Sequence, residues 1–394
     1  MKKVLLIASE YAPGMLSFAS SIINRLSESS EFEVYAVVVS RGKFKYEPLL
    51  CEKAKKKTIC IEAPANCILE KLLFKIWPSK LISNINKTIR DNHIECIHFL
   101  TIDFTLTLFI YLKLRGNNSV YYTVHDLWPH EGERKSLAGR LISCYINWST
   151  KINMKIIPNL TTSSRTQYIA LKDRYPSKKV NLTCFPTLVT SQIVSGERVV
   201  RELNGITNYI LFFGSVDKYK GVDLLLNAYR LLRNKNSFLV VAGKGIQYFD
   251  TNIQKGEIRI NRFIEDSELK YLYENAAIVV YPYRSATMSG VLSLAYYFKK
   301  KLLVSDIPFF IDNISLQTSV FQSGNIYDLS EKIRVKLNEK SHIGDSGYYE
   351  KLYSTDTLIT GYKHFVYLQL IIPQYFISNK SGIWSLSLIV HSKG

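Results

Sequence analysis

Short apolar runs alternate along the chain with stretches of helical periodicity. In the first half, these runs predict strands at residues 4–8, 34–39, 96–100, 120–124 and 159–162. In the second half, they predict strands at residues 209–213, 238–242, 258–263, 277–281 and 302–305. Helical patterns fall between them, for example at residues 17–26, 222–233, 266–275 and 291–298. Strands that alternate with helices favour parallel sheets covered on both faces, so the predicted fold class is α/β.

The composition of the chain changes after Pro186: residues 187–208 are polar and lack a strong apolar period. A chain of 394 residues also exceeds the size at which one core usually stops growing. We therefore expect two tandem doubly wound Rossmann-like domains facing a cleft. Residues 1–190 would form the first, residues 191–355 the second, and residues 356–394 a helix and tail packing back toward the first. Ligands of such domains bind beyond the carboxyl ends of the strands.

Charge is distributed unevenly along the chain. The formal net charge is +18, and the first 190 residues carry 12 of these excess positive charges. Such an excess suits an anionic partner, which could be a nucleic acid, a nucleotide-linked substrate or an anionic membrane face. Within residues 69–90, lysines alternate with large apolar residues, which suits either a helix pair with a solvated basic face or contact with an anionic leaflet.

The six cysteines have no metal-ligand spacing and form no CxxC pair, so we expect reduced thiols and no metal site. The apolar run at residues 4–8 is shorter than the core of a signal peptide, which takes about 7 to 15 residues. No uninterrupted apolar segment approaches the roughly 18 to 20 residues that cross a bilayer. These features predict a cytoplasmic protein that does not span a membrane.

Two turns in the second half are suited to hold a phosphate. In GSVDKYKG, a strand ends at Gly214 and Lys220 stands just before a helix, so an ammonium group and a helix N-terminus converge. The alternative is that Lys220 only caps a surface turn. In SATMSG, Thr287, Ser289 and Gly290 precede the helical run that begins at Val291.

Four polar groups follow one strand of the first half, in TVHDLWPHEG. His125 and Asp126 come directly after the strand, with His130 and Glu131 close behind. Imidazole is the usual side chain for proton transfer near neutral pH, and an adjacent carboxylate can hold its tautomer. We therefore predict functional roles for His125 and Asp126, and acceptor-side roles for His130 and Glu131.

Four motifs of the second half, in this order, resemble family 4 glycosyltransferases of the GT-B fold, of the type that builds bacterial surface polysaccharide and lipopolysaccharide. They are FFGSVDKYKGVDLLLNAYRLL, VVAGKG, INRFIEDSELKYLYENAAIVVYPYRSATMSG and LAYYFKKKLLVSDIP. The resemblance implies transfer of a sugar from a nucleotide diphosphate sugar to an acceptor hydroxyl, with retained anomeric configuration and no required metal or cofactor. It places His125 and Asp126 near the reacting sugar, and Lys220 at the leaving diphosphate.

The resemblance also implies a set of donor-binding positions. They are Gly14, Gly214, Ser215, Lys220, Gly243, Gly245, Arg262, Phe263, Thr287, Ser289, Gly290 and Val291. Three positions depart from the family pattern: Ser215 stands where an arginine is usual, and Ala286 and Leu294 replace a pair of glutamates. Lys218 or Arg262 could substitute for the arginine. Plain core packing is an alternative role for Phe263.

The predicted function is that of a GT-B hexosyltransferase using a UDP- or GDP-sugar and a glycan or lipid-linked acceptor. It would act in the cytoplasm, with a peripheral contact on the inner face of the cytoplasmic membrane. One alternative is a catalytically inactive homologue that binds a nucleotide sugar or a partner protein. Binding of nucleic acid is disfavoured because lysine outnumbers arginine in the basic segments.

Overall fold

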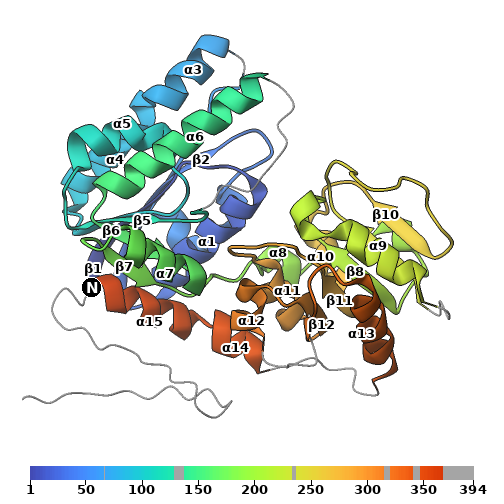
Figure 1. The fold of residues 1–394 in the computed structure, drawn as a ribbon. Helices are drawn as coiled ribbons and strands as arrows, with labels where there is room; N and C mark the ends of the chain where they lie inside the picture. The colour runs from blue at the N-terminus through green and yellow to red at the C-terminus, as the bar shows by residue number, and fades with distance from the viewer. Residues whose placement is uncertain (66, 128–136, 233–236, 315–319, 340–346, 367–394) are drawn as a thin grey trace, which may run out of the picture.

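The computed structural model describes residues 1–65, 67–127, 137–232, 237–314, 320–339 and 347–366. They form two sheets of seven and six strands, and every strand pair within these sheets is parallel (Figure 1). The predicted α/β class with two doubly wound units is confirmed. Among the described residues, no helix is both long enough and apolar enough to cross a lipid bilayer.

The first sheet has the strand order β3-β2-β1-β4-β5-β6-β7. Its strands are β1 (Lys2–Ala8), β2 (Phe32–Ser40), β3 (Thr58–Glu62), β4 (Cys96–Phe99), β5 (Val120–Thr123), β6 (Asn159–Thr162) and β7 (Lys179–Leu182). The central strands are apolar at successive positions because helices cover both faces of the sheet. This arrangement explains why unbroken apolar runs predicted them.

Two helical layers enclose this sheet. One contains α1 (Pro13–Glu28), α2 (Glu52–Lys55) and α15 (Thr355–Val366), which share one buried cluster. The other contains α3 (Ile68–Ile76), α4 (Ser79–Asn92), α6 (Leu137–Ile156) and α7 (Arg165–Arg174). It also holds the 3-10 turn η2 (Phe104–Leu106), the short helix α5 (Thr107–Phe109) and the π turn η3 (Ile110–Leu114).

The second sheet has the strand order β10-β9-β8-β11-β12-β13. Its strands are β8 (Tyr209–Phe213), β9 (Leu239–Ala242), β10 (Glu257–Ile260), β11 (Ala276–Tyr281), β12 (Lys301–Ser305) and β13 (Val320–Phe321). Around it lie α8 (Ser191–Val194), α9 (Val222–Arg230), α10 (Asp266–Glu274), α11 (Val291–Tyr297), α12 (Pro308–Asn313), α13 (Ile326–Asn338) and α14 (Tyr348–Tyr353). One continuous core fills this half.

The strand predicted at residues 258–263 ends earlier, at Ile260. Two side chains after it explain the difference. The Asn261 side-chain oxygen accepts a hydrogen bond from the Gly245 N–H at 3.0 Å, while Arg262 turns into ion pairs with carboxylates. The described residues also contain three strands that the apolar pattern did not indicate, β3, β7 and β13.

The chain crosses between the two halves twice. On the outward crossing, the Leu188 N–H donates to Ser293 Oγ at 3.0 Å. On the return, α14 packs on the second half and α15 packs on α1, as Figure 1 shows along the lower side of the molecule. There Tyr362 hydrogen-bonds His98 Nδ1 at 3.1 Å, and Lys363 pairs with Glu31 at 2.6 Å.

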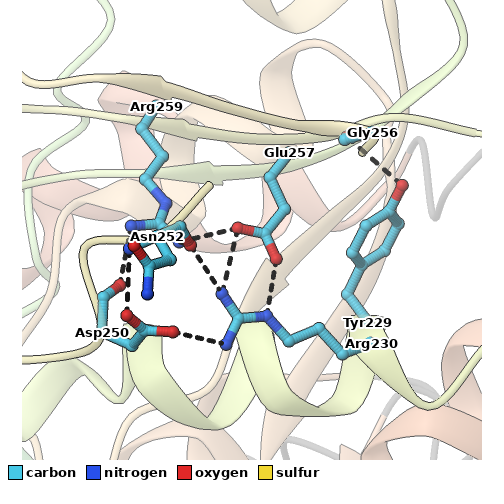
Figure 2. A network of polar contacts seen from close by, with 7 residues as sticks. All are labelled: Tyr229, Arg230, Asp250, Asn252, Gly256, Glu257 and Arg259. Carbon is cyan, nitrogen blue, oxygen red and sulfur yellow. Dashed lines mark hydrogen bonds and ion pairs between the residues drawn. The ribbon is translucent and has the colours of Figure 1, made fainter. Parts of the chain in front are cut away.

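A polar network joins α9 to β10 (Figure 2). The Glu257 side chain is fully buried and accepts hydrogen bonds from Arg230 and Arg259, each at 2.7 Å. Both arginines also donate to the Asn252 backbone oxygen. These contacts hold the loop before β10 against the sheet, so this charged cluster stabilises the fold.

Candidate functional site

The turn after β8 brings an amine back over a glycine. Lys220 Nζ donates to Ser215 Oγ at 2.7 Å, and Ser215 Oγ donates to Asp217 Oδ2 at 2.6 Å. A Cβ atom placed on Gly214 would lie 3.3 Å from Lys220 Nζ. Gly221 ends the turn with a positive φ of 67°, and a Cβ there would lie 2.0 Å from the Pro282 carbonyl oxygen. The turn therefore packs tightly against the loop that follows β11.

Lys220 is buried, with a relative exposure of 9%. Its pKa falls from 10.5 to about 8 because burial penalises the charged form, and Asp217 offsets only part of this effect. The rings of Tyr219 and Tyr283 lie 5.6 and 5.7 Å from Nζ. Among the described residues, no carboxylate forms a direct ion pair with this amine. A buried amine in such a position is suited to receive an anion.

Arg284, in the loop after β11, fixes the position of the Lys220 turn. Its backbone N–H donates to the Tyr219 oxygen at 2.7 Å, and its guanidinium donates to the Lys218 oxygen at 2.9 Å. The same guanidinium forms a two-point pair with Asp223 at the start of α9. Such planar pairs hold geometry as well as charge. The sequence motifs did not single out Arg284.

Tyr283 precedes this arginine and is another residue that sequence reasoning missed. Its hydroxyl is buried and forms no hydrogen bond of ordinary geometry in the described part of the chain, although the Ser289 side chain lies near it. A Cβ on Gly214 would lie 3.8 Å from this hydroxyl. Burial raises the pKa of Tyr283, so the phenol keeps its proton and can donate. An unpaired phenol and an amine therefore lie beside the same glycine.

The segment before α11 is more tightly packed than the sequence indicated. Thr287 and Ser289 are half-buried, whereas Gly290 and Val291 are buried. A Cβ on Gly290 would lie 2.2 Å from the Leu188 side chain, so this glycine lets the segment that links the two halves pack closely against the start of α11. Leu294, at one of the two positions where the family has glutamate, lies in the core, and Ala286, at the other, packs against it. Close approach of a ligand at Gly290 stays a prediction.

The glycines after β9 are also required by the backbone. Gly243 has φ of 147°, and a Cβ there would lie 1.9 Å from the Gly214 oxygen. A Cβ on Gly245 would lie 2.1 Å from the Val216 oxygen. These glycines let the chain after β8 and the chain after β9 stay in contact beyond the ends of the strands. Contact between these two segments therefore explains the glycines at least as well as a bound ligand does.

Arg262 has all five of its guanidinium N–H groups engaged. They donate to both carboxylate oxygens of Glu202, both of Glu268 and the Phe263 backbone oxygen. A phosphate could bind Arg262 only by displacing one of these acceptors. Substitution for the missing family arginine at Ser215 therefore receives no support from this geometry.

Phe263 lies at a cavity of about 180 Å³ between the two halves. From the first half, α1 contributes Leu16 and Ser17, and the segment after β2 contributes residues that include Lys43. Lys43 Nζ lies 5.3 Å from the centre of the Phe263 ring. Gly14, in the first turn of α1, is exposed with open space where its Cβ would be. The half-buried ring of Phe263 therefore lies at an interface between the halves as well as at the edge of the core.

His125 is held in a neutral state after β5. Its Nε2–H donates to the Leu100 carbonyl at 2.7 Å, and the Phe18 ring packs edge-on with its centroid at 4.8 Å. Burial lowers the pKa of His125, with the Leu100 contact opposing it. Burial raises the pKa of Tyr219, and the charges of Asp217 and, less strongly, Asp126 add to this effect, so the two halves approach each other at this point. His130 and Glu131 lie outside the described residues.

A pair of carboxyl groups at the same edge of the first sheet was not predicted. Glu10 follows β1, and burial together with the charge of Asp103 raises its pKa to about 7. Asp103 is fully buried and accepts hydrogen bonds from the N–H groups of Ser9 and Thr101, and its pKa is raised by burial to about 6. Their separation in sequence hid this pair, because only the fold brings the two strand ends together.

No set of three His, Cys, Asp or Glu side chains in the described ranges is arranged to hold a metal ion.

Comparison with known proteins agrees with this geometry. Residues 197–351 match the family model "Glycosyl transferases group 1". No curated protein sequence matches the chain. Among solved structures, Anabaena Alr3699/HepE in complex with UDP and glucose is similar with a TM-score of 0.64 and 12% identity, covering 93% of this chain and 100% of that one.

Two further solved structures share the architecture. Sucrose-phosphate synthase from Thermosynechococcus elongatus has a TM-score of 0.62 and 14% identity, covering 92% of this chain and 98% of that one. WaaG, a glycosyltransferase involved in lipopolysaccharide biosynthesis, has a TM-score of 0.55 and 15% identity, covering 94% and 100%. The GT-B-like fold and a Glycosyl transferases group 1 domain over residues 197–351 are thus confirmed.

Proposed function

We propose that this chain is a retaining glycosyltransferase of family 4. It would move a sugar from a UDP- or GDP-sugar to a hydroxyl of a glycan or lipid-linked acceptor in cell-surface polysaccharide or lipopolysaccharide synthesis. One observation carries the proposal: in a Glycosyl transferases group 1 domain, the buried amine of Lys220 lies over Gly214 without a direct carboxylate partner in the described part of the chain. The UDP complex of a structurally similar protein supports a nucleotide sugar as the donor.

The donor's diphosphate would bind where Lys220 and the unpaired Tyr283 hydroxyl meet beside Gly214. Both groups can donate hydrogen bonds to the oxygens that gain charge as the sugar leaves. The turn is already fixed by Arg284, so little reorganisation is required when charge develops. Thr287 and Ser289 would contact the donor from the segment before α11, and the nucleoside would extend toward Phe263 at the cavity between the halves.

The transfer itself would proceed on one face of the sugar. The acceptor hydroxyl oxygen forms a bond to the anomeric carbon as the bond from that carbon to the phosphate oxygen breaks, and the acceptor proton passes to the departing phosphate. This route retains the configuration without a carboxylate nucleophile. His125 and Asp126 would lie at the reacting sugar and acceptor. Because the pKa of His125 is lowered, its imidazole would act as a neutral hydrogen-bonding group.

The proposed reaction needs no metal ion and takes place in the cytoplasm at the inner face of the membrane. To test it, the protein is incubated with UDP, GDP and ADP sugars, and both thermal stabilisation and transfer are measured with and without EDTA. We expect one nucleotide class to stabilise the protein, and turnover that EDTA leaves unchanged but that Lys220→Ala reduces sharply. If no nucleotide diphosphate or sugar nucleotide binds, the proposal is wrong.

A second candidate is a catalytically inactive GT-B homologue that binds a nucleotide sugar or a partner. Its support is the apolar packing of Ala286 and Leu294, which removes two carboxylates usual in the family. This candidate predicts donor binding that depends on Lys220, with neither transfer nor hydrolysis for any sugar nucleotide tested. The same binding and turnover measurements therefore separate the two.

A further inference from the structure

One helix of the first half buries none of its side chains. α3 is apolar along most of its length, yet Ile68, Leu69, Leu72, Leu73 and Ile76 are each more than half exposed. Trp77 follows and is 37% exposed. A short helix usually gains stability by packing an apolar face against the protein. Contacts within this half leave most of the apolar surface of α3 uncovered.

Neighbouring elements continue this exposed apolar surface. In α5 and η3, Leu108, Tyr111 and Leu112 are 42, 45 and 56% exposed, and on α6 Leu141 and Trp148 are 64 and 56% exposed. Tyr145 links the elements, because its hydroxyl donates to the Lys75 oxygen at 3.2 Å and its ring packs on Phe104 and Trp148. Figure 1 shows α3, α5 and α6 together on one side of the first sheet. We call α3, residues 104–115 and α6 the outer surface.

The outer surface is basic as well as apolar. With α4, these elements carry ten lysines and arginines and only two acidic residues, Glu70 and Asp91. Several of the cations are exposed, including Lys80, Arg140 and Lys151. An apolar face bordered by cations fits the boundary between headgroups and acyl chains of an anionic bilayer. Contiguous exposed apolar patches on soluble proteins usually mark such interaction sites.

We propose that the outer surface docks on an anionic lipid bilayer, with the apolar side chains of α3 and α6 inserted to the depth of the headgroups and the lysines at the lipid phosphates. The charge complementarity favours a bilayer over a second copy of this basic chain, because two such surfaces would repel each other. This inference rests on the proposed function in one respect: docking would serve to bring the first half to a lipid-linked acceptor.

Co-sedimentation with vesicles tests the docking. Wild-type protein is mixed with vesicles of phosphatidylcholine alone, or of phosphatidylcholine with phosphatidylglycerol, at low and high salt. We expect binding to the anionic vesicles that weakens with salt, and at least about tenfold weaker binding to the neutral ones. Absence of binding to the anionic vesicles would overturn the proposal.

Two variants and one control assign the binding to the outer surface. The charge variant Lys71→Gln/Lys75→Gln/Lys151→Gln should bind about a hundredfold more weakly, since each lysine near an anionic surface contributes about 1 kcal/mol. The apolar variant Leu69→Gln/Leu72→Gln/Trp148→Gln should lose binding by at least about tenfold. The control Ile253→Gln/Tyr327→Gln replaces side chains of similar exposure in the second half and should bind as wild type does.

Two further measurements distinguish docking on a bilayer from loss of the donor site and from pairing of two chains. Donor nucleotide should stabilise every variant as it does wild type, so a failure of docking is distinguishable from a failure of the proposed donor site. Sedimentation equilibrium tests whether the outer surface joins two copies of the chain. A dimer that the apolar variant dissolves, with vesicle binding unchanged in that variant, would overturn the proposal.

Discussion

Replacing Lys220 by methionine should make the empty protein more stable and the donor-bound protein less so. Burial lowers the pKa of Lys220 from 10.5 to about 8, which corresponds to about 3 kcal/mol of penalty on the charged amine. The folded state binds fewer protons than the unfolded state between these values. Stability from this group therefore rises with pH from about 8 to about 10.5, and below about 8 the full penalty applies.

The substitution removes this penalty at neutral pH together with one favourable contact. The lost hydrogen bond to Ser215 is worth about 1 kcal/mol, so Lys220→Met should gain about 2 kcal/mol in the free energy of unfolding without ligand. Wild-type protein at about a hundred times its dissociation constant for donor gains about 2.7 kcal/mol, and the variant should lose most of this gain. Lys255→Met, at an exposed lysine, serves as the matched control.

Urea unfolding at about pH 7, with and without the nucleotide diphosphate that binds wild type, measures both effects. A titration of binding adds a second measurement. Donor affinity of wild type should fall as the pH rises above about 8, because binding requires the protonated amine. The reasoning is refuted if Lys220→Met is less stable than wild type when empty and binds donor equally well, since the lysine would then be structural.

Three further predictions concern stability. Glu257→Gln should lower the free energy of unfolding by about 3 kcal/mol at neutral pH, because the ion pairs of buried Glu257 with two arginines are lost. Burial of Glu257 opposes ionisation, but the arginine hydrogen bonds lower its pKa overall. The difference in the free energy of unfolding between wild type and variant, measured with urea, should therefore disappear as the pH falls through that lowered pKa. Glu10→Gln should be up to about 3 kcal/mol more stable than wild type above about pH 7 and no different below about pH 4.5, because its pKa is raised in the folded state; equal urea midpoints at about pH 8 would contradict this. Gly243→Ala should cost about 2 to 3 kcal/mol because its Cβ would meet the Gly214 oxygen, whereas Gly14→Ala, with open space around its Cβ, should cost nothing measurable by thermal unfolding.

Alternation of apolar runs with helical periods was sufficient to predict the two-sheet fold, because most strands buried on both faces are apolar along most of their length. Edge strands such as β3 were missed because two of the five residues in Thr58–Glu62 are exposed and the strand has no unbroken apolar run. The motifs also located the Lys220 turn correctly at the end of β8.

The partners of individual side chains could not be predicted in the same way. The sequence does not show which partner Arg262 has. In the fold, Glu202, sixty residues earlier, and Glu268 both accept hydrogen bonds from its guanidinium. Gly290 suggests close approach of a ligand, and only the fold shows that the Leu188 side chain also packs against it. Asp103 adds to the effect of burial on the pKa of Glu10 because β1 and β4 are neighbours in the sheet. Such effects depend on contacts between distant segments, which no local pattern records.

The two crossings between the halves limit how one half can move against the other. A single linker would permit the halves to twist and slide against each other. Two linking segments restrict the motion mainly to rotation about the line that joins the two segments. The Tyr362 contact with His98 and the Lys363 pair with Glu31 attach α15, on the returning segment, to the first half. Rotation about that line would change the distance between Asp126 and Tyr219, which lie on opposite halves.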